Sequence, residues 1–340
     1  MQKKSDGNSY KQRGIALITV MLMVALVAVI ATQMTSRLQM QIQRTSNIAV
    51  NQQAYWYAMG AEAFGKRVLI DIFKKEPDTT NLNQAWAAGS QTYPVDFGSI
   101  SGEINDLQAC LNLNALRAEI KPPASGAATA NKNPARSAFQ RLIEALKIEG
   151  ITPFDAESLA DSLTDWLDAD SDISSGGGAE DDDYASKEFP YLAANNYMVS
   201  VNELRVVANF TPVIIEALRP HVCVIPNSDQ YKININTISE ESSVLLQALL
   251  GAKVTSEEAS NILSARGEKG FDTIEAFLNS TEVTALKVDI PLEEIFVIDS
   301  EYFSFKSSAN FSDSYFSMTS IMHIVENKKI TVISRTIGRH

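Results

Sequence analysis

The sequence predicts an α+β protein: one long N-terminal helix on an antiparallel sheet, with a large all-α region inserted between the strands. Three observations predict it. An unbroken helical pattern begins near residue 15, strand-like alternation occurs on both sides of the middle of the chain, and the middle itself is helical in period. At 340 residues, of which 45% are apolar, the chain is long enough for two or three domains.

The first element is an apolar segment, residues 15–36, in which no side chain is charged. At roughly 1.5 Å per helical residue it reaches about 33 Å, which is enough to cross a bilayer. A short polar segment, residues 1–14, precedes it and carries four basic residues and one acid. Because positive residues stay in the cytoplasm, the bulk of the chain is expected outside it.

The junction between these two segments does not look like a secretory signal peptide. A signal peptide is cleaved after its apolar stretch, behind small residues, whereas the small residue Gly14 stands before that stretch. The arrangement resembles a type IV prepilin or pseudopilin. This resemblance implies cleavage by prepilin peptidase after Gly14 and N-methylation of the new terminus, Ile15. The alternative is an ordinary signal anchor.

The helical pattern continues beyond the apolar segment, because no proline interrupts residues 37–75 and Glu76-Pro77 then ends it. Two helices with a hinge near Gly60 are the alternative. We expect one face of this second half to pack on a globular domain, through Leu38, Ile42, Ala49, Ala54, Ala58, Phe64, Leu69 and Ile72.

The remaining elements follow from hydrophobic period and from turn residues. Strands are expected over residues 93–104 (as a pair), 302–305, 315–325 and 330–337, with a turn at residues 326–328, and residues 107–116 predict a strand that enters a helix. Residues 121–132 predict a loop. Helices are expected from Asn133-Pro134 to about residue 147, over residues 155–167, 201–207 and 212–218, and in a second unit from residue 233 to about residue 286.

The net charge and the two cysteines indicate which partners and which cellular compartment suit the protein. The net charge is −12, and it becomes −15 once residues 1–14, with their net charge of +3, are removed. A surface this acidic disfavours nucleic acid and anionic lipid and suits divalent cations. The two cysteines, Cys110 and Cys223, fit an oxidising compartment, where they form either a disulfide or two separate buried thiols.

Several short motifs follow one another in a connected order. They are Asn112-Leu113-Asn114-Ala115-Leu116, Asp165-Trp166-Leu167-Asp168-Ala169-Asp170, Gly178-Ala179-Glu180-Asp181, Tyr184, Pro190-Tyr191, Ala194-Asn195, Val201-Asn202-Glu203-Leu204 and Ile233-Asn234-Ile235-Asn236-Thr237. In this order and spacing the chain resembles the GspK family, the large minor pseudopilins of type II secretion systems. The resemblance covers essentially the whole chain.

This resemblance implies a division of the chain and a function without catalysis. The implied function is to cap and nucleate the pseudopilus, for export of folded proteins across the outer membrane. The implied partners are GspI and GspJ, other pseudopilins, prepilin peptidase and the inner membrane, with the C-terminal domain in the periplasm. The implied parts are a leader (1–14), a transmembrane helix (15–36), a pilin-like domain (37–116 plus 287–340), and two SAM-like or helix-hairpin-helix-like units (117–222, which holds an acidic calcium loop, and 223–286).

Thr19 stands where most pilins and pseudopilins carry Glu, at the fifth position of the mature chain. A carboxylate in the hydrocarbon core is costly unless it is paired. In an assembling pilus its partner is the N-terminal amine of the subunit already in place. A subunit that enters first has no such partner, so the loss of the acid agrees with a tip position. A plain transmembrane helix without Glu is the alternative.

The acidic segment 155–188 holds twelve acids and one base, Lys187. Its acids at 168, 170 and 172 alternate as in a calcium loop, but Ile173 and Ala179 stand where an EF-hand needs Gly and Glu. Crowded carboxylates repel one another unless a cation lies among them, and hard oxygen ligands select calcium over zinc. A solvated acidic loop is the alternative. The resemblance favours structural calcium, with expected ligands Asp168, Asp170, Glu180 and Asp181 and further candidates Asp165, Asp172, Asp182 and Asn195.

A rival function comes from residues 233–271, which are similar to the DNA-binding hairpins of competence proteins. Those hairpins hold phosphate with glycine-rich amides, whereas residues 249–254 contain one glycine and lie among glutamates that would repel DNA. We therefore expect no nucleic-acid partner, and a DNA-binding competence pseudopilin is the alternative. No enzyme is expected either, because no H-E-x-x-H, G-x-S-x-G or phosphate loop occurs.

The cleavage hypothesis predicts the behaviour of Gly14→Val. Valine places a branched side chain at the scissile bond, so the leader should remain attached and the protein should stay unassembled. Immunoblotting of membranes from cells that contain prepilin peptidase measures the size of the product. A mutant protein of normal mature size would contradict the prepilin hypothesis.

Overall fold

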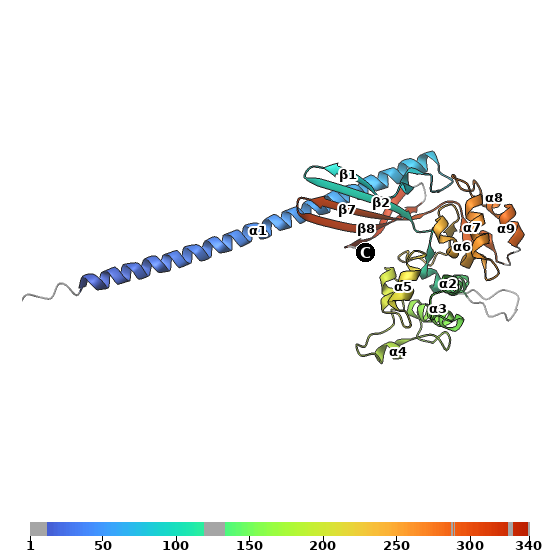
Figure 1. Ribbon diagram of the computed structural model, residues 1–340, viewed down its shortest axis with the longest axis horizontal. Helices are drawn as coiled ribbons and strands as arrows, with labels where there is room; N and C mark the ends of the chain where they lie inside the picture. Colours follow the sequence, from blue (N-terminus) through green and yellow to red (C-terminus); the bar gives the residue numbers. More distant parts are fainter. Residues whose placement is uncertain (1–11, 119–132, 287, 289, 326–328, 339–340) are drawn as a thin grey trace, which may run out of the picture.

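The structure is a computed structural model, and it describes residues 12–118, 133–286, 288, 290–325 and 329–338. A long helix leads into a head, in which a sheet lies along the helix and a helical region lies beyond the sheet (Figure 1). The predicted loop at residues 121–132, the turn at residues 326–328 and the first eleven residues of the leader lie outside the described residues.

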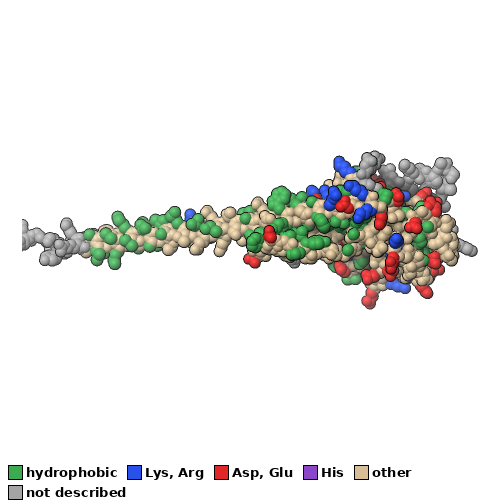
Figure 2. All heavy atoms as spheres, turned by 90° about the horizontal axis from the view of Figure 1, so that it is seen from above, with side chains coloured by type: hydrophobic (Ala, Val, Ile, Leu, Met, Phe, Trp, Pro, Cys, Tyr) green, Lys and Arg blue, Asp and Glu red, His purple; other side chains and the backbone are tan. Residues whose placement is uncertain are grey.

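Helix α1 (Gln12–Lys75) is continuous, which confirms one helix without a hinge at Gly60. Its side chains from residue 14 to residue 49 are all exposed, and apolar groups line its N-terminal part (Figure 2). Among the described residues it is the one helix long and apolar enough to cross a membrane. Burial against the sheet begins at Ala54 and continues through Ala58, Ala61, Leu69 and Phe73.

Four of the predicted contact residues of α1 are therefore exposed: Leu38, Ile42, Ala49 and Phe64. The first three lie before the sheet begins, since the β7–β8 turn at the sheet's end reaches α1 at Asn51, which accepts a hydrogen bond from Ser314 Oγ. Phe64 is exposed beside the sheet, and its ring contacts the ring of Tyr93 edge to face, with 5.9 Å between the ring centroids.

The sheet has five antiparallel strands in the order β1-β2-β7-β8-β9. Strands β1 (Gln91–Val95) and β2 (Gly98–Asp106) precede the helical region, and β7 (Tyr302–Phe311), β8 (Ser314–Val325) and β9 (Lys329–Ile337) follow it. Strand β7 starts where predicted but extends beyond residue 305, because it pairs with β2 as far as Phe311. The pairing of β2 with β7 makes the helical region an insertion into the sheet domain, as expected.

Helix α1 is fixed on the sheet by a buried carboxylate, Glu62, which the sequence did not single out. Glu62 accepts hydrogen bonds from Ser320 Oγ (2.6 Å) and from Arg335 Nε (2.7 Å) and Nη2 (3.0 Å). Burial raises the pKa of this carboxyl, but these hydrogen bonds outweigh burial and leave the pKa below its usual value. The ion pair defines how far along α1 the edge strand β9 lies.

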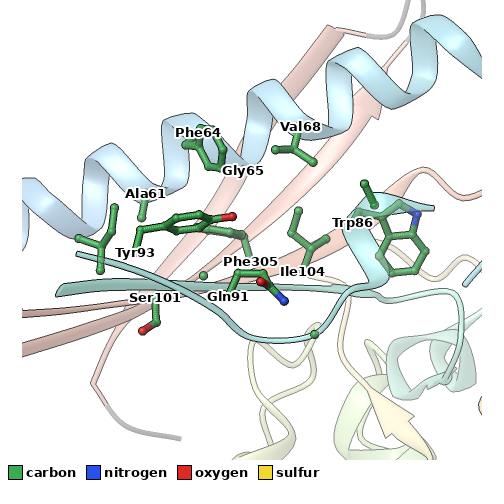
Figure 3. A pocket seen from close by; sticks show the side chains of 14 residues that line it. Ala61, Phe64, Gly65, Val68, Trp86, Gln91, Tyr93, Ser101, Ile104 and Phe305 are labelled. Carbon is green, nitrogen blue, oxygen red and sulfur yellow. The ribbon is translucent and has the colours of Figure 1, made fainter. Parts of the chain in front are cut away.

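A small apolar pocket of about 80 Å³ remains between α1 and the β1–β2 hairpin (Figure 3). The Phe305 ring occupies the space beside Gly65 and Gly102, where an added Cβ would lie 2.6 and 2.8 Å from ring atoms. Ligand pockets usually enclose at least about 300 Å³. This pocket is therefore a packing gap of the helix–sheet core.

The inserted region has one continuous apolar core, which extends from Leu111 to Phe296. The side chain of Asn133 caps α2 by accepting a hydrogen bond from Ala135 N (2.8 Å), as predicted. The elements are η1 (Ala85–Ala87) before the sheet, then β3 (Leu111–Asn112), η2 (Leu113–Arg117), α2 (Pro134–Leu146), α3 (Pro153–Leu167), α4 (Asp181–Ala185), η3 (Val201–Arg205), α5 (Pro212–Leu218), β4 (Val222–Cys223), β5 (Ile233–Asn234), η4 (Glu240–Ser242), α6 (Ser243–Leu250), α7 (Ser256–Ala265), α8 (Ile274–Leu278), α9 (Thr281–Leu286), α10 (Leu292–Ile295) and β6 (Phe296–Val297).

Two of the predicted helices differ from the structure. Residues 201–205 form a 3₁₀ helix, capped by Ser200 and Glu203. Residues 233–234 are a strand parallel to β6 instead of a helix start, because Asn234 is used for long-range bonding. Its backbone N donates to Gln108 O, and its side chain donates to Thr80 O and Ser300 Oγ. The unit boundaries proposed at residues 222 and 286 stay a prediction.

The sheet joins the helical region at a buried polar junction around Asp106, the last residue of β2. Its carboxylate accepts hydrogen bonds from Thr237 Oγ1 (2.6 Å), Ser300 Oγ (2.6 Å) and the backbone N of Gln108 (2.7 Å). Burial, which outweighs these hydrogen bonds, raises the pKa of Asp106 to about 6. Beside this junction, Cys110 and Cys223 are joined in a disulfide.

This junction predicts a stability effect of pH. The pKa of Asp106 is about 6 in the folded protein and about 3.9 in an unfolded chain, so the folded state binds the proton more tightly. The proton on Asp106 therefore adds to the free energy of unfolding. This addition, on the order of 2–3 kcal/mol, is fully present below pH 4 and is lost as the pH rises to about 6. Asp106→Asn should remove this dependence of stability on pH, because the amide does not titrate.

Denaturant unfolding of the full chain in detergent, followed by tryptophan fluorescence from pH 4 to pH 8, measures the effect. Glu103→Gln is the matched control, because Glu103 lies on the same strand outside the junction. If Asp106→Asn and wild type lose stability equally between pH 4 and pH 6, Asp106 does not titrate as described.

Candidate metal centre

The acidic segment is held by α3 and by the loop that follows it. Helix α3 begins with a capping box between Thr152 and Asp155 and ends at Leu167. Asp165, near its end, is fully buried and accepts hydrogen bonds from Ser174 N (3.1 Å) and Ala179 N (3.0 Å). One carboxylate thus ties both ends of the following turn to the helix, so the chain folds back on itself.

The turn requires its glycines. A Cβ added to Gly178 would lie 1.9 Å from Asp165 Oδ2, and one added to Gly177 would lie 2.6 Å from Ser158 Oγ. The carbonyl of Gly177 also accepts a hydrogen bond from Ser162 Oγ (3.1 Å). Any side chain at these positions would push the turn away from α3.

Three of the four expected ligands come together. One carboxylate oxygen from each of Asp168, Asp170 and Glu180 lies within 4.8 Å of the others. Glu180 is 3% exposed, although it is an acid. The fourth expected ligand, Asp181, lies outside this group, because its Oδ1 accepts a hydrogen bond from Ala193 N (2.9 Å).

The electrostatics of this group are unfavourable without a counter-charge. Burial, followed by the charges of Asp170 and Asp165, raises the pKa of Asp168 to about 7. Burial, followed by the charges of Asp165 and Asp168, raises the pKa of Glu180 to about 7. Each carboxyl is thus disfavoured in its ionised form by desolvation and by its neighbours.

Three buried oxygen atoms of this group and one of Asn195 lack a hydrogen-bond donor in the described part of the chain. Among the described residues, Asp168 Oδ1, both carboxylate oxygens of Glu180 and Asn195 Oδ1 have no hydrogen-bond partner. Asn195 adopts a positive φ of 44° and donates Nδ2 to Asp170 O (3.0 Å), which fixes its side chain against the loop. Carboxylate, amide and carbonyl oxygens are the ligands of calcium, so the donor set fits a hard divalent cation.

The other sequence candidates have different positions. Asp165 ties the loop, while Asp172 and Asp182 are exposed and do not belong to the group of three. Asn195, expected only as a helper, is attached to the loop through Asp170 O and has a buried Oδ1 without a hydrogen-bond partner. Its sequence signal is weak, since an asparagine at positive φ is recognised only when the backbone is known.

At the start of α1, Gly14 and the first residues of the apolar segment, Ile15 and Thr19 among them, are all exposed. The hydroxyl of Thr19 donates to Ala16 O (2.9 Å) within its own helix.

The helix-hairpin-helix resemblance corresponds to α6, α7 and the turn between them. Arg266, which follows α7, is buried and donates Nη1 to Ile235 O (2.9 Å) and Ile238 O (2.7 Å). This cation therefore supports the strand-to-helix connection at β5.

Comparison with known proteins gives one consistent family. Two sequence models described as Type II secretion system (T2SS), protein K match residues 109–227 and 233–299. Type II secretion system protein K of Aeromonas hydrophila is 36% identical over 329 residues, which cover 96% of this chain and 98% of that protein. The protein K of Pectobacterium carotovorum subsp. carotovorum is 33% identical, over 96% of this chain and 97% of that protein.

A solved structure extends the likeness to three dimensions. A chain from the crystal structure of the GspK-GspI-GspJ complex of the enterotoxigenic Escherichia coli type 2 secretion system superposes with a TM-score of 0.76 at 29% identity. The match covers 87% of this chain and 100% of that chain. With family models across the inserted region and relatives along nearly its whole length, this chain belongs to the GspK family of type II secretion minor pseudopilins.

Proposed function

We propose that this protein is the non-enzymatic tip subunit of a type II secretion pseudopilus, which it caps and nucleates together with GspI and GspJ. The observation that carries the proposal is the likeness, over 87% of the chain, to a chain of the GspK-GspI-GspJ complex. One N-terminal apolar helix then anchors it in the inner membrane, and the head lies in the periplasm.

Helix α1 supports an assembly role. Its residues 14–49 are exposed throughout, which leaves a surface several turns long for the helices of other pseudopilins. Thr19 satisfies its hydroxyl within the helix and adds no charge to the membrane segment. We propose that prepilin peptidase cleaves after Gly14 and that Ile15 is then N-methylated; among the described residues, no atom lies within 4 Å of the Cβ position that a side chain at residue 14 would have.

We also propose that the head binds structural calcium through Asp168, Asp170 and Glu180, with Asn195 as a fourth oxygen ligand. The support is the group of three carboxylates and the four buried oxygen atoms without donors. When bound, the cation supplies the positive charge that these carboxylates otherwise lack. Asp181, an expected ligand, would act instead by holding the segment around Ala193.

The assembly proposal predicts co-purification of the full chain with GspI and GspJ in detergent. Ile48→Glu places a charge on the exposed surface of α1, where Ile48 is 58% exposed, and should weaken the complex at least tenfold. Val199→Glu is the matched control, because Val199 is 64% exposed on the head. Size-exclusion chromatography with quantified subunit bands measures the effect.

Failure of the wild-type chain to join GspI and GspJ would contradict the assembly proposal. The competence alternative makes a different prediction, namely salt-sensitive binding of duplex DNA to the full chain. An electrophoretic mobility assay at low and high salt separates the two functions.

The calcium proposal predicts that chelation lowers the melting temperature of the protein and that calcium restores it better than magnesium. The stabilisation grows as RT ln(1 + [L]/Kd), about 2.7 kcal/mol at a hundredfold excess over Kd. Magnesium demands tighter octahedral geometry and gives up its water reluctantly. Differential scanning fluorimetry in calcium, magnesium and chelator measures the effect.

Neutral variants identify the ligands in the same experiment. Glu180→Gln should abolish the response to calcium and raise the melting temperature in chelator, because it removes a repelling buried charge. Asp181→Asn is the matched control and should keep the response. Identical melting of the wild-type protein in calcium and in chelator would leave the segment as a solvated acidic loop.

A further inference from the structure

A surface hollow of about 250 Å³ lies where the inserted region meets the face of the sheet opposite α1. Side chains alternate along β7, so Phe303 and Phe305 are buried in the core with α1, whereas Ser304 and Lys306 lie on the other face and line the hollow. In Figure 1, α1 lies above the strands and α5 lies below them. The opposite wall comes from η3, the end of α5 and β4. An occupant of the hollow would therefore contact the sheet and the inserted region at once.

The walls of the hollow are mainly apolar. Ile321 of β8 and Leu107, which follows β2, line it from the sheet, and Val222 of β4 lines it from the inserted region. Val199 also lines it and is 64% exposed. An apolar side chain left in water beside other apolar groups on a concave surface is typical of an interaction site. The walls thus suit an aliphatic side chain of a partner.

Two charged residues line the hollow, and both are cations, Arg219 and Lys306; no acid is among the described residues that line it. The ammonium of Lys306 forms no hydrogen bond or ion pair with a described residue. Arg219 donates Nη2 to Asn202 Oδ1 (3.3 Å), and its Nε lies 3.5 Å from Glu216 Oε2, but the Glu216 side chain is 80% exposed. Because so exposed an ion pair contributes little, both cations can bind a further carboxylate.

The acids beside the hollow have other partners. Glu103 is paired with Lys306 in the β2–β7 register, but its Oε1 accepts a hydrogen bond from Asn105 Nδ2 (3.2 Å). Glu203 Oε1 accepts a hydrogen bond from the backbone N of Val199 (2.7 Å). Neither acid lines the hollow. In a chain with a net charge of −12, the hollow is a local reversal of sign, so charge complementarity selects an acidic partner.

The size of the hollow indicates what kind of partner fits. Pockets for small molecules usually enclose about 300–1,000 Å³, so this hollow is small for a whole ligand, whereas one or two side chains of a protein segment fit into it. Hydroxyl groups of Ser200, Thr319 and Thr336 stand among the apolar walls and can donate hydrogen bonds to the backbone of such a segment.

The wall from the inserted region is held in place before any partner binds. Strand β4, whose Val222 and Cys223 line the hollow, is paired with β3, and Cys223 is joined to Cys110 by the disulfide. A wall that is already fixed loses little conformational freedom on binding, which favours affinity.

We propose that this hollow docks a segment of a partner protein in which an aliphatic side chain stands next to an aspartate or glutamate. The aliphatic side chain would lie against Val199 and Ile321, and the carboxylate would pair with Lys306 and Arg219. This docking does not depend on the proposed calcium site, and it uses a surface other than the α1 surface proposed for GspI and GspJ.

The test uses the full chain in uncharged detergent and the peptide fluorescein-Ser-Ile-Asp-Ile-Glu-Ser-amide. Fluorescence anisotropy measures its dissociation constant, and empty micelles correct for binding to detergent. Because the chain is acidic as a whole, its overall charge repels this peptide, so binding reports a local basic site. Lys306→Glu should weaken binding at least tenfold. Lys329→Glu is the matched control and should change nothing, because Lys329 is exposed on β9 and does not line the hollow.

Equal melting temperatures of the two variants in differential scanning fluorimetry show that both are folded. Three results would overturn the proposal: no binding of the acidic peptide to the wild-type chain, equal binding by Lys306→Glu and Lys329→Glu, or equal binding of the charge-reversed peptide fluorescein-Ser-Ile-Lys-Ile-Lys-Ser-amide. The apolar contact has its own test, which needs no change in the protein. A peptide with serine in place of both isoleucines should bind at least tenfold more weakly, and equal binding would contradict the apolar contact.

Discussion

The whole architecture depends on one helix that serves two different environments. The N-terminal half of α1 is exposed and apolar, whereas the half beyond Ala54 is buried against a sheet. A helix of this kind needs a fixed point where the second environment begins. Glu62 provides it, because a buried carboxylate paired with Arg335 and Ser320 tolerates no shift along the helix axis without the loss of its partners. The sheet and everything inserted into it are positioned from that contact.

The insertion then needs a firm connection to the sheet, because it leaves after β2 and returns before β7. Two features of different chemistry meet there. Asp106 gathers Thr237, Ser300 and Gln108 around one buried carboxylate. The disulfide joins Cys110 to Cys223 at a sequence separation of 113 residues, which the chain-entropy account values at about 4–5 kcal/mol. The hydrogen bonds set the orientation, and the covalent bond limits how far the unfolded chain can separate.

Local signals predicted the elements well and the contacts between them poorly. The proline-free stretch before Glu76-Pro77 gave the extent of α1, and Asn133-Pro134 gave the start of α2, because caps and breakers act within a few residues. The buried face of α1 was placed too early, since the position where a sheet ends is a tertiary property. The strand at residues 233–234 was missed for the same reason. The side chain of Asn234 donates hydrogen bonds to Thr80 O and Ser300 Oγ, which are far away in the chain.

The acidic segment shows the same division between what the sequence marks and what the tertiary structure decides. Sequence composition marks twelve acids as one group, but the structure divides them by burial. Asp172 and Asp182 are solvated, as acids without a structural task normally are. Glu180 is buried beside Asp168, with oxygen atoms that lack donors. A loop that needed only solubility would gain nothing from this burial, which costs desolvation and repulsion together. Glu180 and its neighbour Asp168 are therefore the part of the segment that supports the proposed cation site.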